Sequence, residues 1–310
     1  MKVVFIMGAG HCGSTLLDLI LGSHSKAFSL GEFKQFNSRL QASEAGSGEV
    51  CGVCAVDCPV WQGELLAKLK PVLGNGQGVR RVVTALGRRL RNPYKTLNES
   101  IEQDVIIDSS KHPIWIRNRL APRYLWKDVQ PYLIYLHRDG RAVTNSYFRK
   151  YPERTYPVIV DDWLQQVAQM ESYFEEFDAG PKLKLGYESL ADATADTAES
   201  LCKFLGLDFE PGMLGYWQHD HHHLGGNGGT RHLIFRYREQ FGGHSEQMEK
   251  RIVESKQHYS HEYYDATRIA IKLDERWRDE LSVEQLQVFE ERAQPANAGY
   301  VYQTDDAIPG

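Results

Sequence analysis

Long apolar runs are missing from this sequence. No apolar stretch approaches the roughly 18 residues that suggest a membrane-spanning helix. The apolar start, residues 1–7, turns to glycines after too few apolar residues for a secretory signal. We therefore interpret it as the first buried strand of the fold, and we expect a cytoplasmic protein without a membrane span.

An excess of positive charge is also absent. The 310 residues include 36 Lys and Arg against 41 Asp and Glu, which gives a formal net charge of −5 at pH 7. A protein whose main task is to coat nucleic acid or a heparin-like polymer needs a dominant basic field. The composition argues against that class, so we expect no nucleic-acid partner, while local basic pockets stay compatible with the sequence.

Cysteine is scarce, and its number is odd. Three of the five cysteines crowd into Cys51, Cys54 and Cys58. Without an export signal, this distribution is not typical of a disulfide framework. The remaining composition, 42% hydrophobic and 25% charged, is that of an ordinary globular protein.

Five short apolar segments are predicted to be strands, at residues 2–7, 27–30, 104–107, 132–137 and 182–186. Their uninterrupted apolar character suits strands that are buried on both faces of a parallel sheet. Helices are predicted between them, beginning after Gly13, Pro113, Gly140, Pro157 and Ser189. This alternation predicts an α/β fold with three layers around a central, mostly parallel sheet.

We expect residues 1–310 to form a single domain, since α/β folds of this size often share one core. The Gly-rich stretch 46–78 is interpreted as an insertion over one edge of the sheet. A helix is predicted over residues 189–205, ending at Gly206. Residues 259–291 are predicted to be helical and to pack back on the body through Trp277, Leu281 and Phe289.

A glycine-rich loop follows the first predicted strand and leads directly into an apolar helix. Its sequence is Gly8-Ala9-Gly10-His11-Cys12-Gly13-Ser14-Thr15. Glycines let backbone amides face inward, and the unpaired N–H groups at a helix start attract phosphate. We expect the loop to bind a phosphate through Gly10, His11, Cys12, Gly13, Ser14 and Thr15; a plain tight connection is the alternative.

The loop lacks one residue of the nucleoside triphosphatase pattern. Gly8 and Gly13 have the required separation, but Ser14 stands where that pattern has a lysine. The lysine normally reaches β and γ phosphates. A donor with a single 5'-phosphate, such as 3'-phosphoadenosine 5'-phosphosulfate (PAPS), has no need of it.

Over nearly its whole length the sequence resembles the P-loop sulfotransferases, in particular the bacterial branch related to the tyrosylprotein and carbohydrate enzymes. The resemblance rests on the order and spacing of several short motifs. Besides the loop, these are Gly22-Ser23-His24, Leu30-Gly31-Glu32, Ile107-Asp108-Ser109-Ser110-Lys111, Leu136-His137-Arg138-Asp139-Gly140-Arg141 with Ser146, Gly186-Tyr187-Glu188-Ser189-Leu190, and Gly225-Gly226-Asn227 with Arg231. It implies a P-loop nucleotide-binding fold and PAPS as the donor.

The resemblance also implies roles for donor-binding residues. Arg138 and Ser146 would hold the 3'-phosphate, and Tyr187 would line the adenine site. The late loop would close over the cofactor through Gly226, Asn227 and Arg231. The plainer alternatives are an Arg138 paired with Asp139 and a Tyr187 that only fills the core.

The expected catalytic residues are His11, Glu32 and Lys111. His11 departs from the lysine or arginine that most relatives place on the bridging oxygen, and a histidinium there would make activity depend on pH. Lys111 matches the position where the sulfotransferase family has a lysine or histidine that faces the transferred sulfuryl group. Glu32 is the expected base, with His112 in reserve; a Glu32 that only caps a helix and a Lys111 on the surface are the alternatives.

The spacing Cys51-x2-Cys54-x3-Cys58 raises a zinc hypothesis. Structural zinc sites usually have four ligands, and a second CxxC is missing, so we expect reduced or partly paired thiols and no metal; a histidine as fourth ligand is the alternative. Residues 219–223 contain four histidines, which we interpret as a solvated loop because adjacent histidines cannot all face one metal.

The expected activity is in-line transfer of a sulfuryl group from PAPS to a hydroxyl or amine of a small-molecule, lipid or carbohydrate acceptor, with no metal required. One alternative is a nucleotide-dependent kinase or hydrolase, which Asp108 at a strand end keeps open. A second is a nucleotide-binding scaffold without catalysis, because His11 replaces the usual cation. The acceptor and the oligomeric state stay open.

Overall fold

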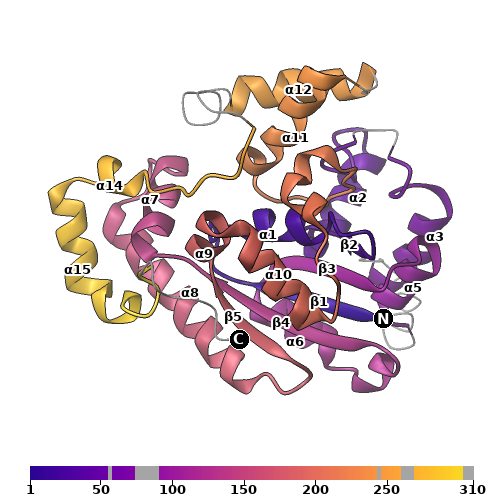
Figure 1. Ribbon diagram of the computed structural model, residues 1–310, viewed down its shortest axis with the longest axis horizontal. Coiled ribbons are helices and arrows are strands. Elements are labelled where there is room, and N and C mark those ends of the chain that lie inside the picture. Colours follow the sequence, from indigo (N-terminus) through magenta and orange to yellow (C-terminus); the bar gives the residue numbers. More distant parts are fainter. Residues whose placement is uncertain (55–57, 74–90, 243–245, 260–268, 303–310) are drawn as a thin grey trace.

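The structure is a computed structural model that describes residues 1–54, 58–73, 91–242, 246–259 and 269–302. A sheet of five parallel strands runs through its centre (Figure 1). The strands are β1 (Lys2–Met7), β2 (Ala27–Ser29), β3 (Val105–Lys111), β4 (Gln130–His137) and β5 (Lys182–Gly186), in the order β2-β3-β1-β4-β5. The predicted α/β class and all five predicted strands are confirmed.

The central strands form because their apolar residues are buried on both faces, whereas the edge strand β5 has an exposed Lys184. Val3, Val4, Phe5, Ile6 and Met7 of β1 are fully buried between its neighbours β3 and β4. Such a strand places polar backbone groups where water does not reach, and the parallel ladders on both sides satisfy them. The apolar runs in the sequence are therefore sufficient to predict these strands.

Strand β3 is longer than predicted, because it continues through four polar residues to Lys111. Buried Asp108 accepts hydrogen bonds from the hydroxyl of Tyr94 at 2.6 Å and from Nε1 of Trp115 at 2.8 Å. The amide of Ser110 donates to the same carboxylate at 2.9 Å. These bonds let polar side chains remain in a buried strand, which the hydrophobic pattern alone cannot indicate.

Helices cover both faces of the sheet. Helix α1 (Ser14–Leu21) follows β1 toward the β2 side, whereas α6 (Pro113–Leu120) and α8 (Tyr156–Glu176) lie in crossovers that lead the opposite way. Because such crossovers are right-handed, opposite directions place their helices on opposite faces. Figure 1 shows α1 on one side of the sheet and α6 and α8 on the other.

The predicted helix over residues 189–205 is two helices, α9 (Tyr187–Asp192) and α10 (Thr194–Leu205). They break at Ala193, which has φ −112° and ψ 54°. The carbonyl of Ser189 accepts the amide of Ala193 and the hydroxyl of Thr197, both at 3.0 Å, and these bonds stabilise the bend. The predicted end is confirmed, since Gly206 adopts a left-handed cap with φ 63°.

The prediction for residues 259–291 is wrong in part. Residues 260–268 lie outside the described residues, and 269–276 form no helix. Helices α14 (Trp277–Glu280) and α15 (Val283–Asn297) follow, the second opened by a capping box at Ser282. Trp277, Leu281 and Phe289 are buried, and both helices contact α7 (Gly140–Lys150).

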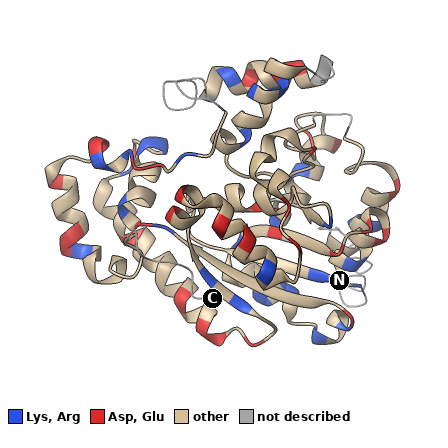
Figure 2. Cartoon of the chain, viewed as in Figure 1, with Lys and Arg blue, Asp and Glu red and all other residues tan. Residues whose placement is uncertain are grey.

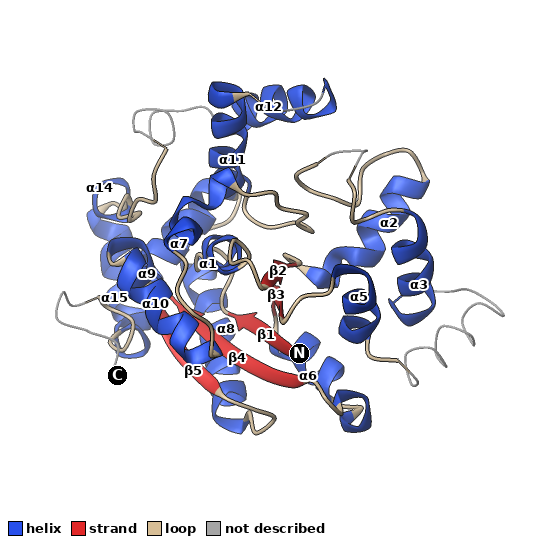
Figure 3. Ribbon diagram, turned by 45° about the vertical axis from the view of Figure 1, so that its right-hand side comes forward, coloured by secondary structure: helices blue, strands red, loops and turns tan. Residues whose placement is uncertain are grey.

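The remaining elements surround this core. Figure 3 shows α2 (Phe36–Glu44), α3 (Gly63–Leu73) and α5 (Pro93–Ile101) grouped to one side of β2. Of the expected insertion 46–78, residues 55–57 and 74–78 lie outside the described residues. The elements not yet named are three short 3-10 helices and two α-helices. They are η1 (Phe33–Gln35), η3 (Arg123–Trp126), η4 (Pro211–Gln218), α11 (Gly228–Phe241) and α12 (Glu246–Tyr259).

Acidic and basic residues are intermingled along the described chain (Figure 2), in keeping with the small net charge. Among the described residues, no helix combines the length and apolar character that crossing a bilayer requires.

We predict that Gly13→Ala destabilises the protein far more than Gly46→Ala. Both glycines have positive φ, +94° and +68°, so alanine is strained at each by about 1 kcal/mol. Only at Gly13 would the new Cβ also lie 2.3 Å from the ring of Tyr187, whereas nothing lies within 4 Å at Gly46. Urea unfolding measures the difference; equal losses would show that the ring yields freely.

Candidate functional site

The carboxyl ends of all five parallel strands meet at one edge of the sheet. Strand order reverses beside β1, and in open α/β sheets the crevice at such a point binds ligands. Each strand end is followed by residues singled out from the sequence: the glycine loop after β1, Glu32 after β2, Lys111 in β3, Arg138 after β4 and Tyr187 after β5. These residues lie at one edge because all five strands are parallel and end there.

The glycine loop is closely packed against its surroundings. A side chain on Gly10 would lie 1.8 Å from the hydroxyl of Tyr147, and Gly13, the N-cap of α1, provides no side-chain cap. Cys12, Ser14 and Thr15 are buried. The first N–H groups of a helix have no intrahelical partners, so the start of α1 offers donors that suit an anion. The amides of Gly10 and Cys12 already donate to Gln166 and Ala9, both at 3.3 Å.

Two residues at this edge have a strained backbone. His11 and Lys111 have φ of 61° and 69°, although neither is a glycine. Left-handed conformations in such residues cluster at functional sites, where the surrounding structure imposes them. The ring of His11 lies against Tyr147 with centroids 4.4 Å apart, and its Nδ1 lies 2.7 Å from Oγ of Ser146. The structure therefore joins His11 to the predicted phosphate-binding serine.

Burial and nearby cations lower the pKa of His11 to about 3. Burial is the largest cause, followed by the positive charges of Lys150, Lys111, Arg138 and Arg149. In the unliganded protein His11 is thus neutral at physiological pH. The same charges create a positive field at the glycine loop, which attracts an anion.

Arg138 is buried beside the loop, and both of its terminal nitrogens have hydrogen-bond partners, whereas its buried Nε has none among the described residues. It donates to the backbone carbonyl of His11 at 3.1 Å and to that of Asp274 at 2.8 Å, and it forms an ion pair with the Asp274 carboxylate at 3.3 Å. Asp139, the partner considered from the sequence, instead forms an ion pair with Arg141. The guanidinium is therefore held by the loop and by residues 269–276, not by its sequence neighbour.

Tyr187 lies between the loop and Arg138. It is buried at the start of α9, its ring backs Gly13, and the guanidinium of Arg138 stacks over it at 4.2 Å. A tyrosine in this place supports the backbone of the loop.

Glu32 and Lys111 form an ion pair. Nζ of Lys111 lies 2.7 Å from Oε1 of Glu32, whose Oε2 accepts from Gln35 at 2.7 Å. Burial raises the pKa of Glu32, but the opposing effects of Lys111, Lys34 and the hydrogen bonds outweigh it and hold the pKa below its ordinary value. Glu32 is thus an ionised carboxylate next to a cation, while His112 is exposed.

The late loop reaches the glycine loop through backbone pairing. Leu224 pairs with the end of β2, since its amide donates to Leu30 and its carbonyl accepts from Glu32. Three residues later the amide of Asn227 donates to Oγ1 of Thr15 at 2.8 Å, and a Cβ on Gly226 would contact the same side chain. Arg231 points elsewhere, with a bond to the carbonyl of Gly52 at 2.6 Å.

Sequence reasoning missed a buried polar cluster behind the loop. Oδ2 of Asp18 lies 2.8 Å from Nε2 of His223 and accepts a hydrogen bond from Ser109. The sequence feature that could have indicated this cluster is Asp18, an acidic residue within an otherwise apolar helix. The prediction that residues 219–223 form a solvated loop is wrong, because His221 and His223 are buried.

Comparison with known proteins identifies a matching family. Residues 130–211, which include Arg138, Ser146 and Tyr187, match the model of the Sulfotransferase family. Comparison with curated protein sequences returns no significant match.

Two solved structures share the fold. The sulfotransferase domain of the Synechococcus PCC 7002 olefin synthase is 19% identical with a TM-score of 0.50, over 94% of each chain. The sulfotransferase domain from the curacin biosynthetic pathway is 18% identical with a TM-score of 0.50, over 97% of this chain and 99% of that one.

We predict that His11→Asn weakens the dependence of stability on pH. Between the ordinary pKa of about 6.5 and the value of about 3 in the fold, only the unfolded state binds a proton at His11, so stability is lost as pH falls through this window. From pH 6.5 to 5 the loss is about 1.5 kcal/mol. Asparagine cannot titrate and tolerates positive φ.

Urea unfolding at several pH values measures this effect. His258→Asn, which removes an exposed imidazole from α12, controls for the substitution itself. An unchanged pH slope in His11→Asn would contradict the assignment of a buried, neutral His11.

Proposed function

We propose that this chain transfers a sulfuryl group from PAPS to a hydroxyl or amine of an acceptor. The match of residues 130–211 to the Sulfotransferase family model supports the proposal. The observation that carries the proposal is the positive field at a glycine loop without the triphosphatase lysine. PAPS brings a 5'-phosphosulfate and a 3'-phosphate, and both need positive surroundings. The loop needs to hold only one phosphate, which its backbone amides and the start of α1 can do.

The donor would contact residues on three strand ends. Residues 10–15 would bind the 5'-phosphosulfate, for which the amides of Gly10 and Cys12 must first leave Gln166 and Ala9. Arg138 with Ser146 would bind the 3'-phosphate. The Asp274 carboxylate occupies one side of the Arg138 guanidinium. A phosphate there must share the guanidinium with this carboxylate or displace it. Tyr187 would lie beside the adenine, and Gly226 and Asn227 would cover the cofactor. Arg231 would join them only after leaving the carbonyl of Gly52.

In the proposed reaction an acceptor oxygen forms a bond to sulfur, and the bond from sulfur to the phosphate oxygen breaks. Glu32 takes the proton of the acceptor hydroxyl, for which its ionised state is suited. Lys111 and His11 stabilise the charge that develops on the bridging oxygen as adenosine 3',5'-bisphosphate leaves. A bound anion offsets the cations that suppress protonation of His11, so donor binding favours the imidazolium.

A nucleotide-dependent kinase or hydrolase is the second candidate. It needs a strand-end carboxylate free to hold a metal, and Asp108 is the residue that the sequence offers for this role, although β3 continues to Lys111. The carboxylate of Asp108 is already engaged by Tyr94, Trp115 and Ser110. This favours sulfuryl transfer, for which residues 1–310 would act as one domain.

The test of this function is transfer of labelled sulfate from PAPS to panels of phenols, sugars, lipid alcohols and amines. We expect label on one acceptor class, and Glu32→Gln should lower kcat by about a hundredfold or more without weakening binding of adenosine 3',5'-bisphosphate. Glu44→Gln, at the exposed end of α2, is the matched control. Magnesium-dependent nucleotide turnover, or PAPS binding without transfer to any acceptor, would contradict the proposal.

We predict that Arg138→Lys weakens binding of adenosine 3',5'-bisphosphate by about 2 kcal/mol, because lysine cannot reproduce the guanidinium fork. Ser146→Ala should weaken it in the same direction. Adenosine 5'-monophosphate, which lacks the 3'-phosphate, should lose much less affinity in both variants. Calorimetry that finds equal losses for the two ligands would show general damage to the site instead of a lost phosphate contact.

A further inference from the structure

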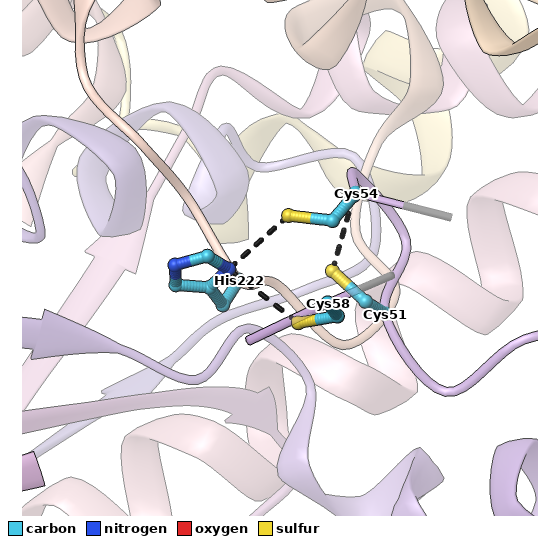
Figure 4. A group of neighbouring side chains, drawn as sticks. All are labelled: Cys51, Cys54, Cys58 and His222. Carbon is cyan, nitrogen blue, oxygen red and sulfur yellow. Dashed lines mark hydrogen bonds between the residues drawn. The ribbon is translucent and has the colours of Figure 1, made fainter. Parts of the chain in front are cut away.

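Cys51, Cys54, Cys58 and His222 meet in space, although the histidine lies more than 160 residues further along the chain (Figure 4). Their three sulfurs and one ring nitrogen all lie within 4.8 Å of one another. Nδ1 of His222 lies 3.1 Å from Sγ of Cys54 and 3.5 Å from Sγ of Cys58. The missing fourth ligand, which argued against a metal in the sequence, is therefore present in the fold.

The spacing of these atoms suits a tetrahedral ion. Zinc bonds of about 2.3 Å to sulfur and about 2.0 Å to nitrogen place neighbouring ligand atoms roughly 3.5–3.8 Å apart. Three sulfurs and one imidazole are also the donor set that zinc prefers, whereas magnesium and calcium prefer oxygen. The separations of 3.1 and 3.5 Å from Nδ1 of His222 to two of the sulfurs are close to these values.

Backbone amides donate to two of the three sulfurs. The amides of Val53 and Cys54 donate to Sγ of Cys51 at 3.4 and 3.3 Å, and the amide of Trp61 donates to Sγ of Cys58 at 3.5 Å. Hydrogen bonds to a charged sulfur stabilise it and orient it toward a metal.

The histidine is also held in place. Nε1 of Trp61 donates to the carbonyl of His222 at 2.6 Å, and the ring of Phe28 lies parallel to the imidazole with centroids 6.3 Å apart. These contacts leave Nδ1 facing the sulfurs, as Figure 4 shows. A ligand oriented by its neighbours is typical of a metal site.

We propose that Cys51, Cys54, Cys58 and His222 bind one zinc ion in a closed structural site. All four positions of the tetrahedron are protein ligands, so the ion has no open position for a substrate. The proposal does not depend on the transferase activity.

The ion would connect two segments that lie far apart in the sequence. Residues 51–54 and 58 lie on one side, and His222 belongs to the segment whose next residues reach Asp18, Leu30 and Thr15. Direct bonds already connect the two sides, from the amide of Gly52 to His223 at 2.7 Å. Zinc would add a covalent-like link at the end of this interface, and its binding free energy would stabilise the fold.

The test is the metal content of the full chain, purified without chelators and analysed by elemental mass spectrometry. We expect about one zinc ion per chain in the wild type and much less in Cys58→Ala and His222→Ala. Cys202→Ala, which removes a buried cysteine outside the cluster, should retain zinc. His222→Cys, which restores a fourth ligand, should also retain it.

A second measurement separates lost binding from misfolding. Wild-type protein stripped of metal should take up cobalt(II) and show the thiolate charge-transfer and strong visible bands of tetrahedral coordination, and zinc should displace it and raise the Tm. Wild-type protein without zinc that also fails to bind cobalt would overturn the proposal. A disulfide among Cys51, Cys54 and Cys58 in freshly purified protein, found by mass spectrometry, would equally overturn it.

Discussion

The parallel sheet imposes the arrangement of the whole site. In a parallel sheet every strand ends at the same edge, so one edge collects five loops from distant parts of the chain. Here those loops bring a glycine cradle, an acid, a lysine, an arginine and a tyrosine together. The cations among them are near enough to suppress protonation of His11, which shows that the edge has one shared electrostatic environment.

Much of this arrangement could be predicted from the sequence because its causes are local. Uninterrupted apolar runs predict buried parallel strands, and their order with the helices between them predicts which residues follow each strand end. Glu32 and Lys111 could therefore be expected at the same edge. Their ion pair could not be predicted from the sequence, because it depends on the register in which β2 and β3 pair.

The features that escaped prediction depend on contacts between distant residues. Strand β3 continues through Asp108 because Tyr94 and Trp115 donate to its carboxylate. Of the histidines in residues 219–223, His221 and His223 are buried. Asp18 provides His223 with a partner, and the next residue, Leu224, pairs with Gly31 just after β2. The fourth ligand of the cysteine cluster belongs to the same segment. The local sequence pattern does not indicate which distant residues come into contact.

The non-helical segment 269–276 also depends on a contact between distant residues. A buried arginine is unfavourable without a partner, and the strand order places Arg138 at the crowded centre of the edge. Asp274 meets this need with both its carbonyl and its carboxylate, and Arg276 in turn holds that carboxylate. A helix over these residues would turn its carbonyls along its own axis and could not offer one to the guanidinium in this way. The charge of Arg138 therefore overrides the helical pattern of the surrounding sequence, and the chain becomes helical again only at Trp277.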